Sequence, residues 1–207
     1  MTLTLEEGKE LVRLARSTLD SFVTDGKFER RSWNEGYLAV KRGVFSTLNT
    51  RADEGDFLRG CIGYPYPMKP LGVAVQETTV AAASEDPRFP PVTRRELGHI
   101  VVEVSALTVP VEVKTSSSSL SSRKELPDLI EVGRDGLIIT AGYQSGLLLP
   151  QVAVEQKWAA DEFLSQTCMK AGLLPDTWLD PKTTIQRFQA EIFGEEAPRG
   201  EVKQVQI

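Results

Sequence analysis

The chain has 207 residues and a formal net charge of −5, and its hydrophobic and charged fractions, 41% and 26%, are ordinary for a globular protein. The acidic balance argues against non-specific nucleic-acid binding, and no apolar run approaches the roughly 18 residues of a membrane-spanning helix. Two cysteines do not form a disulfide framework and the N-terminus lacks a signal-peptide pattern, so we expect a cytoplasmic protein of one large domain or two small ones.

The first half of the chain predicts two helices on either side of a β-hairpin. Thr4 and Glu7 have the spacing of a capping box, and apolar residues then recur at helical intervals. Pro70 suits the start of the second helix, which cannot continue into the proline-rich loop 84–91. Cys61 is expected near the end of the returning strand. The predicted elements are a helix over 5–24, strands over 43–48 and 57–62, and a helix over 70–83.

The second half predicts several short strands and one helix. Residues 109–114 are expected to extend or pair with the preceding strand, and the serine-rich segment 116–122 is expected to be a flexible loop. Because helices are few and hairpins are several, we predict an α+β fold with a mixed or largely antiparallel sheet. The predicted elements are strands over 100–107, 136–140 and 146–149, a helix over 159–171, and a last strand over 184–193.

The sequence excludes several common kinds of site. The single histidine, His99, rules out a metal site built from several histidines. The chain has no C-x-x-C pair, no phosphate-binding G-x-x-x-x-G-K-[ST] loop, no G-x-G-x-x-G and no G-x-S-x-G. We therefore predict neither a metal site nor a bound cofactor.

Cys61 is the first candidate for chemistry. Its thiolate could act as a nucleophile or redox group, with Arg59 on the same strand face lowering the thiol pKa and His99 acting as a partner base. Gly60 and Gly63 on either side would let the backbone turn or approach a neighbour closely. The alternatives are a cysteine that fills a tight junction as a small apolar residue, and a half-exposed histidine at a strand edge.

Other polar residues form a second group of candidates. Glu77 and Asp86 could do acid–base work, but Asp86 and Arg88 are also expected to anchor the proline-rich loop through hydrogen bonds and an ion pair. Gln151 follows a strand and a proline, where its amide would either face a pocket or cap a helix start. Cys168, on the third predicted helix, is expected to be a residue of the protein core.

Six segments of the chain carry a family resemblance: Leu58–Gly63, Ser84–Phe89, Val132–Leu137, Leu148–Val152, Phe163-Leu164 with Cys168–Leu173, and Trp178. In this order they resemble the AMMECR domain family over residues 4–193, and the block around Cys61 is the hallmark of that family. The resemblance implies two subdomains with a cleft between them near Cys61, and residues 194–207 are left as a polar, irregular tail. It also implies a pathway shared with Memo-like and radical-SAM proteins, which become candidate partners.

Three functions follow from these residues and the resemblance. The first is an enzyme or catalytic subunit with a pocket around Cys61, and the second is a non-catalytic adaptor for a partner protein. The third, a nucleic-acid-binding protein with a local basic cleft, is opposed by the acidic charge. For the enzyme, the catalytic candidates are Cys61 and Glu77, and the binding candidates are Arg59, Gly60, Gly63, Asp86, Arg88 and Gln151.

Overall fold

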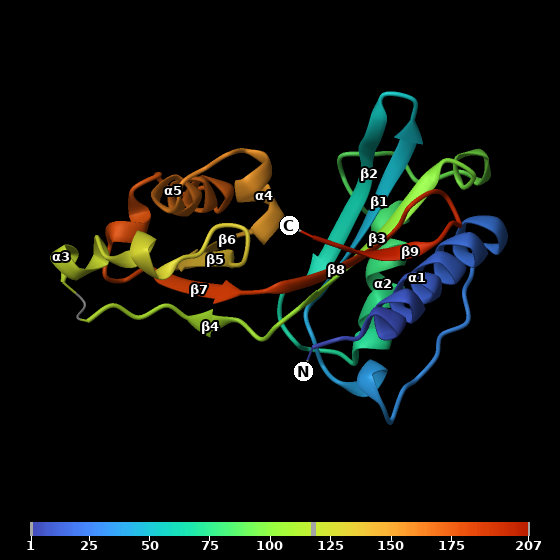
Figure 1. Cartoon of the computed structure of the whole chain (residues 1–207), viewed down its shortest axis with the longest axis horizontal. Coiled ribbons are helices and arrows are strands. Elements are labelled where there is room, and N and C mark those ends of the chain that lie inside the picture. Colours follow the sequence, from blue (N-terminus) through green and yellow to red (C-terminus); the bar gives the residue numbers. More distant parts are fainter. Residues whose placement is uncertain (1, 117–118, 207) are drawn as a thin grey trace. The chain divides into compact units, whose positions relative to one another are not determined.

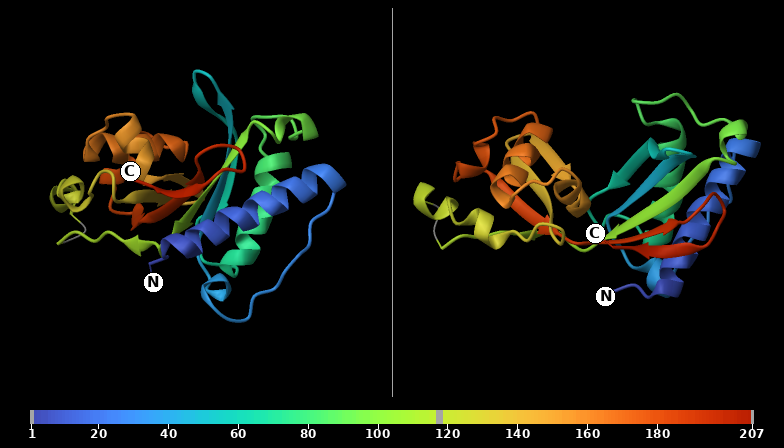
Figure 2. Two further views of the ribbon diagram at one scale, coloured as in Figure 1. Left: turned by 45° about the vertical axis from the view of Figure 1, so that its right-hand side comes forward. Right: turned by 45° about the horizontal axis from the view of Figure 1, so that its top comes forward.

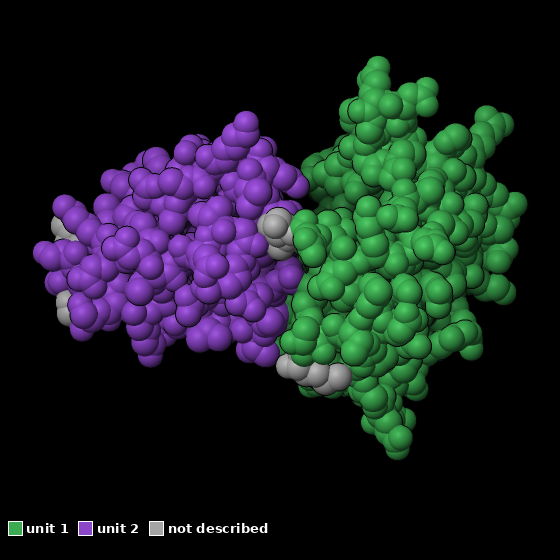
Figure 3. Space-filling model, in the orientation of Figure 1, with its two compact units in different colours: residues 1–107, 191–206 green, residues 108–190, 207 purple. Residues whose placement is uncertain are grey.

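The computed structural model describes residues 2–116 and 119–206, without the side chain of Leu120. The chain forms two compact units (Figure 3). Unit 1 contains the residues up to Leu107 together with Glu191–Gln206, and unit 2 contains Thr108–Ala190. Unit 2 is therefore an insertion between two segments of unit 1, and the chain returns to unit 1 at Glu191. Within the described ranges, none of the helices has both the length and the apolar character needed to cross a bilayer.

Unit 1 is a five-stranded sheet with two long helices on one face (Figures 1 and 2). The strand order is β2-β1-β3-β8-β9, so β2 and β9 are its edges. The buried apolar residues between the helices and the sheet form one core. The elements are α1 (Leu5–Asp25), β1 (Val44–Ala52), β2 (Gly55–Tyr64), α2 (Leu71–Ser84), β3 (Ile100–Leu107), β8 (Ala190–Glu195) and β9 (Val202–Val205), with short 3-10 turns at Tyr37–Ala39 and Arg94–Glu96.

The ends of α1 are set by local chemistry. The Thr4 hydroxyl accepts a hydrogen bond from the Glu7 backbone N–H at 3.3 Å, and the Glu7 carboxylate accepts one from the Thr4 backbone N–H at 2.7 Å. Gly26 ends the helix in the left-handed conformation, with φ of 68°. The helix predicted over 5–24 and its capping box are thus confirmed.

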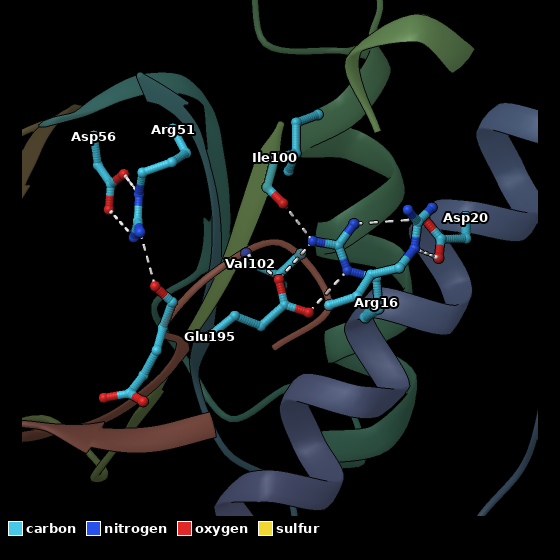
Figure 4. Close-up of polar contacts among 9 residues, drawn as sticks. Arg16, Asp20, Arg51, Asp56, Ile100, Val102 and Glu195 are labelled. Atoms are coloured by element: carbon cyan, nitrogen blue, oxygen red, sulfur yellow. Dashed lines mark hydrogen bonds and ion pairs between the residues drawn. The ribbon is translucent and has the colours of Figure 1, made fainter. Parts of the chain in front are cut away.

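A buried ion pair ties α1 to the sheet (Figure 4). Nε and Nη2 of Arg16 donate to the two carboxylate oxygens of Glu195, at 2.9 and 2.5 Å, and Nη2 also donates to the carbonyl of Ile100. The backbone N–H of Val102 donates to Glu195 at 3.0 Å. Since both charged side chains are nearly inaccessible to water, they stabilise the unit only while they remain together.

Unit 2 is a smaller antiparallel sheet with its own core. The strand order is β4-β7-β5-β6, and α5 packs on the sheet through Phe163, Leu164 and Cys168, all fully buried. The prediction that Cys168 lies in the core is confirmed. The elements are β4 (Val111–Glu112), α3 (Leu120–Arg123), β5 (Gly136–Ala141), β6 (Gln144–Leu148), α4 (Pro150–Glu155), α5 (Ala160–Lys170) and β7 (Thr184–Phe188), with 3-10 turns at Leu126–Leu129 and Thr177–Leu179.

The α+β prediction with antiparallel sheets is confirmed, but two strand assignments differ. The strand predicted over 184–193 divides at Gln189 into β7 and β8, which belong to different sheets. The alternation of apolar residues continues across this point, so the pattern does not reveal the break. Residues 111–112 form β4, which pairs with β7 instead of extending or pairing with β3.

Two segments predicted to be irregular contain regular structure. In the serine-rich segment, Leu120–Arg123 form α3, whose start is capped by the Ser119 hydroxyl; residues 117 and 118 lie outside the described residues. In the polar tail, Val202–Val205 form β9, which pairs with β8. A short edge strand with only two apolar residues gives too weak a pattern to be recognised in sequence.

Candidate functional site

Cys61 lies in a row of three polar side chains that crosses the unit 1 sheet. Thr47 on β1 pairs with Cys61 on β2 and with Glu103 on β3, and cross-strand partners share one face of a sheet. Ile62, the next residue after Cys61, packs on the core beneath the helices, so the row lies on the opposite face. The Thr47 hydroxyl donates to Sγ of Cys61 at 3.4 Å. Thiol, hydroxyl and carboxylate thus lie side by side, and Cys61 is near the end of β2, as expected.

The backbone of Cys61 is fixed at the open edge of the sheet. Its N–H donates to Oδ2 of Asp86 at 2.9 Å, and its carbonyl accepts a longer contact of 3.5 Å from Nη2 of Arg88. The two side chains also bind each other, with Nε and Nη2 of Arg88 at 2.9 and 2.7 Å from the carboxylate oxygens. Asp86 and Arg88 therefore anchor their loop, as predicted, and also cover a strand edge that would otherwise be open.

These surroundings set the protonation of both groups. The side-chain hydrogen bond from Arg88 lowers the pKa of the almost completely buried Asp86 far below its ordinary range, so this carboxylate stays charged. For Cys61 the largest effect is burial, which raises the pKa of the thiol. The Thr47 hydrogen bond and the Arg88 charge lower it, while Glu103 and Asp86 raise it. The net effect keeps Cys61 a protonated thiol near neutral pH.

Arg59 is engaged away from the thiol. It lies where the β1–β2 register shifts, its Nε donates to Glu96 at 2.6 Å, and its guanidinium lies 5.8 Å from the centre of the Phe89 ring. Arg88 approaches the same ring at 5.4 Å. The cation that acts on the Cys61 thiol is therefore Arg88.

The two glycines of the Cys61 block each allow a close approach. A Cβ added to Gly60 would lie 2.2 Å from the carbonyl oxygen of Ala82, at the end of α2. One added to Gly63 would lie 2.3 Å from the ring of Phe45. The strand can lie directly on the helix and on its neighbour only because these side chains are absent.

The two remaining candidates make other contacts. The Glu77 carboxylate accepts from the Tyr64 hydroxyl at 3.2 Å and pairs with Lys69. Gln151 belongs to unit 2, near the start of α4, and its buried Oε1 has no hydrogen-bond partner among the described residues.

His99 does not reach Cys61. Its carbonyl accepts from the N–H of Arg51, which lies four residues along β1 from Thr47, a separation of roughly 13 Å. The hypothesis of a Cys61–His99 dyad is therefore wrong. Sequence reasoning also missed Thr47 and Glu103, because only the register of three strands brings them beside Cys61. Among the described residues, no three histidine, cysteine or acidic side chains are grouped so that they could hold a metal ion.

Comparison with known proteins identifies the family. The AMMECR1 family model matches residues 12–193. The chain belongs to the AMMECR1 family. Its similar relatives include a protein of Thermococcus gammatolerans, 51% identical over 200 residues that cover 96% of this chain and 95% of the relative. Protein MJ0810 of Methanocaldococcus jannaschii is 49% identical over 200 residues, covering 97% of this chain and 96% of that protein.

A solved structure supports the fold of this AMMECR1-family chain. The crystal structure of the uncharacterized protein PH0010 from Pyrococcus horikoshii matches with a TM-score of 0.90 and 45% identity, covering 99% of both chains. The resemblance seen in the sequence motifs is thus confirmed. The comparisons therefore give the family and the fold.

Proposed function

We propose that this AMMECR1-family protein is an enzyme, or the catalytic subunit of one, that moves protons on a small substrate bound over Thr47. In this proposal the Cys61 thiol donates a proton and the Glu103 carboxylate accepts one. The observation that supports it is the cross-strand row in which a thiol and a carboxylate lie on either side of one hydroxyl.

The protonation of Cys61 favours an acid over a nucleophile. A nucleophilic cysteine needs a lowered pKa, whereas burial raises the pKa of this thiol and the charge of Glu103 raises it further. A protonated thiol beside a negative carboxylate instead supplies an acid and a base in one site. β2 and β3 lie on either side of β1, roughly 10 Å apart, so a substrate that reaches both groups would have to bind above Thr47.

The proton balance is complete within the site. Glu103 takes a proton from one carbon of the substrate, and Cys61 gives its proton to another atom, so the substrate is isomerised. The protein is left with a thiolate and a neutral carboxylic acid. Exchange with solvent, or transfer through the Thr47 hydroxyl, restores both groups. Arg88 lowers the pKa of Cys61 and so stabilises the thiolate in that state.

The neighbouring residues would then be positioning residues. Asp86 holds the backbone N–H of Cys61, and Gly60 lets β2 lie on α2, so both fix where the thiol points. Glu77 has no step in this mechanism. Gln151 lies in the other unit and has none either.

Proton transfer can be tested without knowing the natural substrate. Small 2-oxo acids and aldehydes are incubated with the protein in D2O, and deuterium incorporation at carbon is followed by NMR. We expect exchange with at least one compound, a loss of about 100-fold or more in Cys61→Ala and Glu103→Gln, and full exchange in Cys168→Ala. Equal exchange in wild type and Cys61→Ala, or no exchange above buffer with any compound, contradicts the proposal.

A second candidate function, an adaptor for another protein, is favoured by one observation. Phe57 and Leu58 on the edge strand β2 are 51% and 42% exposed, which is unusual for neighbouring large apolar residues. The Memo-like and radical-SAM proteins implied by the family resemblance are the candidate partners. Capture of either protein by the wild-type chain, and its loss in Phe57→Glu but not in Arg95→Glu, would support this function; equal capture by both variants would exclude this surface.

A further inference from the structure

Unit 2 contains a hollow that the proposed function does not use. Its volume is about 410 Å³, within the range of small-molecule sites. Val109, Val111 and Phe188 form apolar walls, and Arg134, Asp135 and Arg187 bring charged groups to it. Arg134 and Asp135 belong to the segment Val132–Leu137, one of the motifs that the Cys61 site leaves unexplained.

The acid in this hollow is already neutralised. The Asp135 side chain is 2% exposed, and its carboxylate accepts hydrogen bonds from Nε and Nη2 of Arg134, both at 2.9 Å, and from the N–H of Glu131 at 3.0 Å. Although burial raises the pKa of Asp135, these bonds bring it below its ordinary value, so the group stays charged. Arg134 also pairs through Nη1 with the carboxylate of Glu131, so Arg134, Glu131 and Asp135 form one ionic cluster.

Arg187 is only partly engaged by this cluster. Its Nη1 donates to the carbonyl of Leu129 at 2.8 Å and lies 3.7 Å from Oδ2 of Asp135. Among the described residues, its Nε and Nη2 have no partner, and the side chain is 43% exposed. The Nε–Nη2 edge of a guanidinium carries two parallel N–H groups that match the two oxygens of a carboxylate.

The apolar wall lies beside this edge. Val111 on β4 is the cross-strand partner of Arg187 on β7, so the two side chains share one face of the sheet. Val109 and Val111 are 60% and 61% exposed, although valine is usually buried. An apolar surface next to a half-exposed guanidinium suits an amphipathic anion.

We propose that this hollow binds a small organic monocarboxylate, whose carboxylate lies on the Nε–Nη2 edge of Arg187 and whose apolar body lies against Val109, Val111 and Phe188. A structural role explains Arg134, which holds Asp135, and Nη1 of Arg187, which holds the carbonyl of Leu129, but it does not explain the Nε–Nη2 edge of Arg187. The site is independent of Cys61, since all its residues belong to unit 2.

The test uses three probes that separate charge from apolar contact. The whole chain, labelled with ¹⁵N, is titrated with hexanoate, acetate and hexanamide while the backbone amide signals are followed by NMR. We expect hexanoate to bind most tightly and to shift the amides of Thr108, Val111 and Gln189. In Arg187→Gln the affinity for hexanoate should fall about tenfold or more, and Arg187→Lys should recover only part of it.

Controls make each outcome decisive. Arg95→Gln removes an exposed arginine of unit 1 and should leave hexanoate binding unchanged. An unchanged amide spectrum away from position 187 shows that each variant is folded. No shifts with millimolar hexanoate, or shifts that persist in Arg187→Gln, would overturn the proposal. Equal affinity for acetate would refute the apolar contact, and equal affinity for hexanamide would refute the role of charge.

Discussion

At the level of single residues, the segment around Cys61 is held from three sides. Asp86 fixes its backbone N–H, Thr47 donates to its sulfur, and Gly60 lets the strand rest on the carbonyl of Ala82. Much of the family hallmark is therefore explained by packing and hydrogen bonding. What packing does not explain is why a thiol and a carboxylate lie on the same face beside Thr47.

Replacing Gly60 by alanine should destabilise the protein strongly. The added methyl group would lie 2.2 Å from a backbone oxygen of α2, which cannot move without shifting the helix. We expect a loss of about 3 kcal/mol in the free energy of unfolding, measured by urea denaturation. Gly98→Ala is the matched control, because a Cβ there meets nothing within 4 Å. Equal stability of the two variants would show that the contact is absent.

The pKa of the Cys61 thiol should be higher than that of an ordinary cysteine, and two substitutions should shift this pKa in opposite directions. Arg88→Gln removes a charge that lowers its pKa, so the pKa should rise; Glu103→Gln removes one that raises it, so the pKa should fall. The rate of alkylation by iodoacetamide against pH, in a Cys168→Ala background, measures both. A shift in the same direction for both variants would contradict this account of the site.

At the level of elements, the buried pair Arg16–Glu195 joins a helix and two strands that are distant in sequence (Figure 4). Replacing Glu195 by glutamine removes the buried countercharge of Arg16 and leaves it only the longer, partly exposed contact with Asp20, at 3.5 Å. The expected loss is about 3 to 5 kcal/mol of unfolding free energy, and Glu196→Gln, at an exposed neighbouring position, should cost less than about 0.5 kcal/mol. Thermal unfolding of the two variants provides the comparison.

Prediction from sequence succeeded where the signal is local. The capping box of α1 depends on residues three apart, and the Asp86–Arg88 pair on residues two apart, so both could be inferred. The row of Cys61, Thr47 and Glu103 could not be inferred from the sequence, because it depends on the register of three strands. The division of the last predicted strand at Gln189 was missed for a related reason: strand periodicity does not state which sheet a strand joins.

For the molecule as a whole, acid should reduce stability through two buried carboxylates, one in each unit. The pKa values of Asp86 and Asp135 are lowered in the folded chain, so their contribution is complete above the unfolded value of about 3.9 and is lost as the pH falls below it. Asp86→Asn should lower the unfolding free energy at pH 7 by about 2 kcal/mol. It should also make stability depend less steeply on pH below about 5, as measured by urea denaturation.

The control for this effect is Asp53→Asn, an exposed carboxylate in the turn between β1 and β2. It should leave both the stability at pH 7 and the acid dependence unchanged. If Asp86→Asn and the wild type lost stability in parallel between pH 5 and pH 2, the lowered pKa of Asp86 would be refuted.

Because unit 2 interrupts unit 1 between β3 and β8, the order of synthesis on the ribosome differs from the order in which the units can be completed. When Leu107 has emerged, the first sheet still lacks β8 and β9, and Arg16 still lacks its buried partner Glu195. The strands of the second sheet, from β4 to β7, are by contrast all present once Phe188 has been made. Unit 2 can therefore complete its sheet during translation, whereas unit 1 can complete its sheet only after the end of the chain has been made.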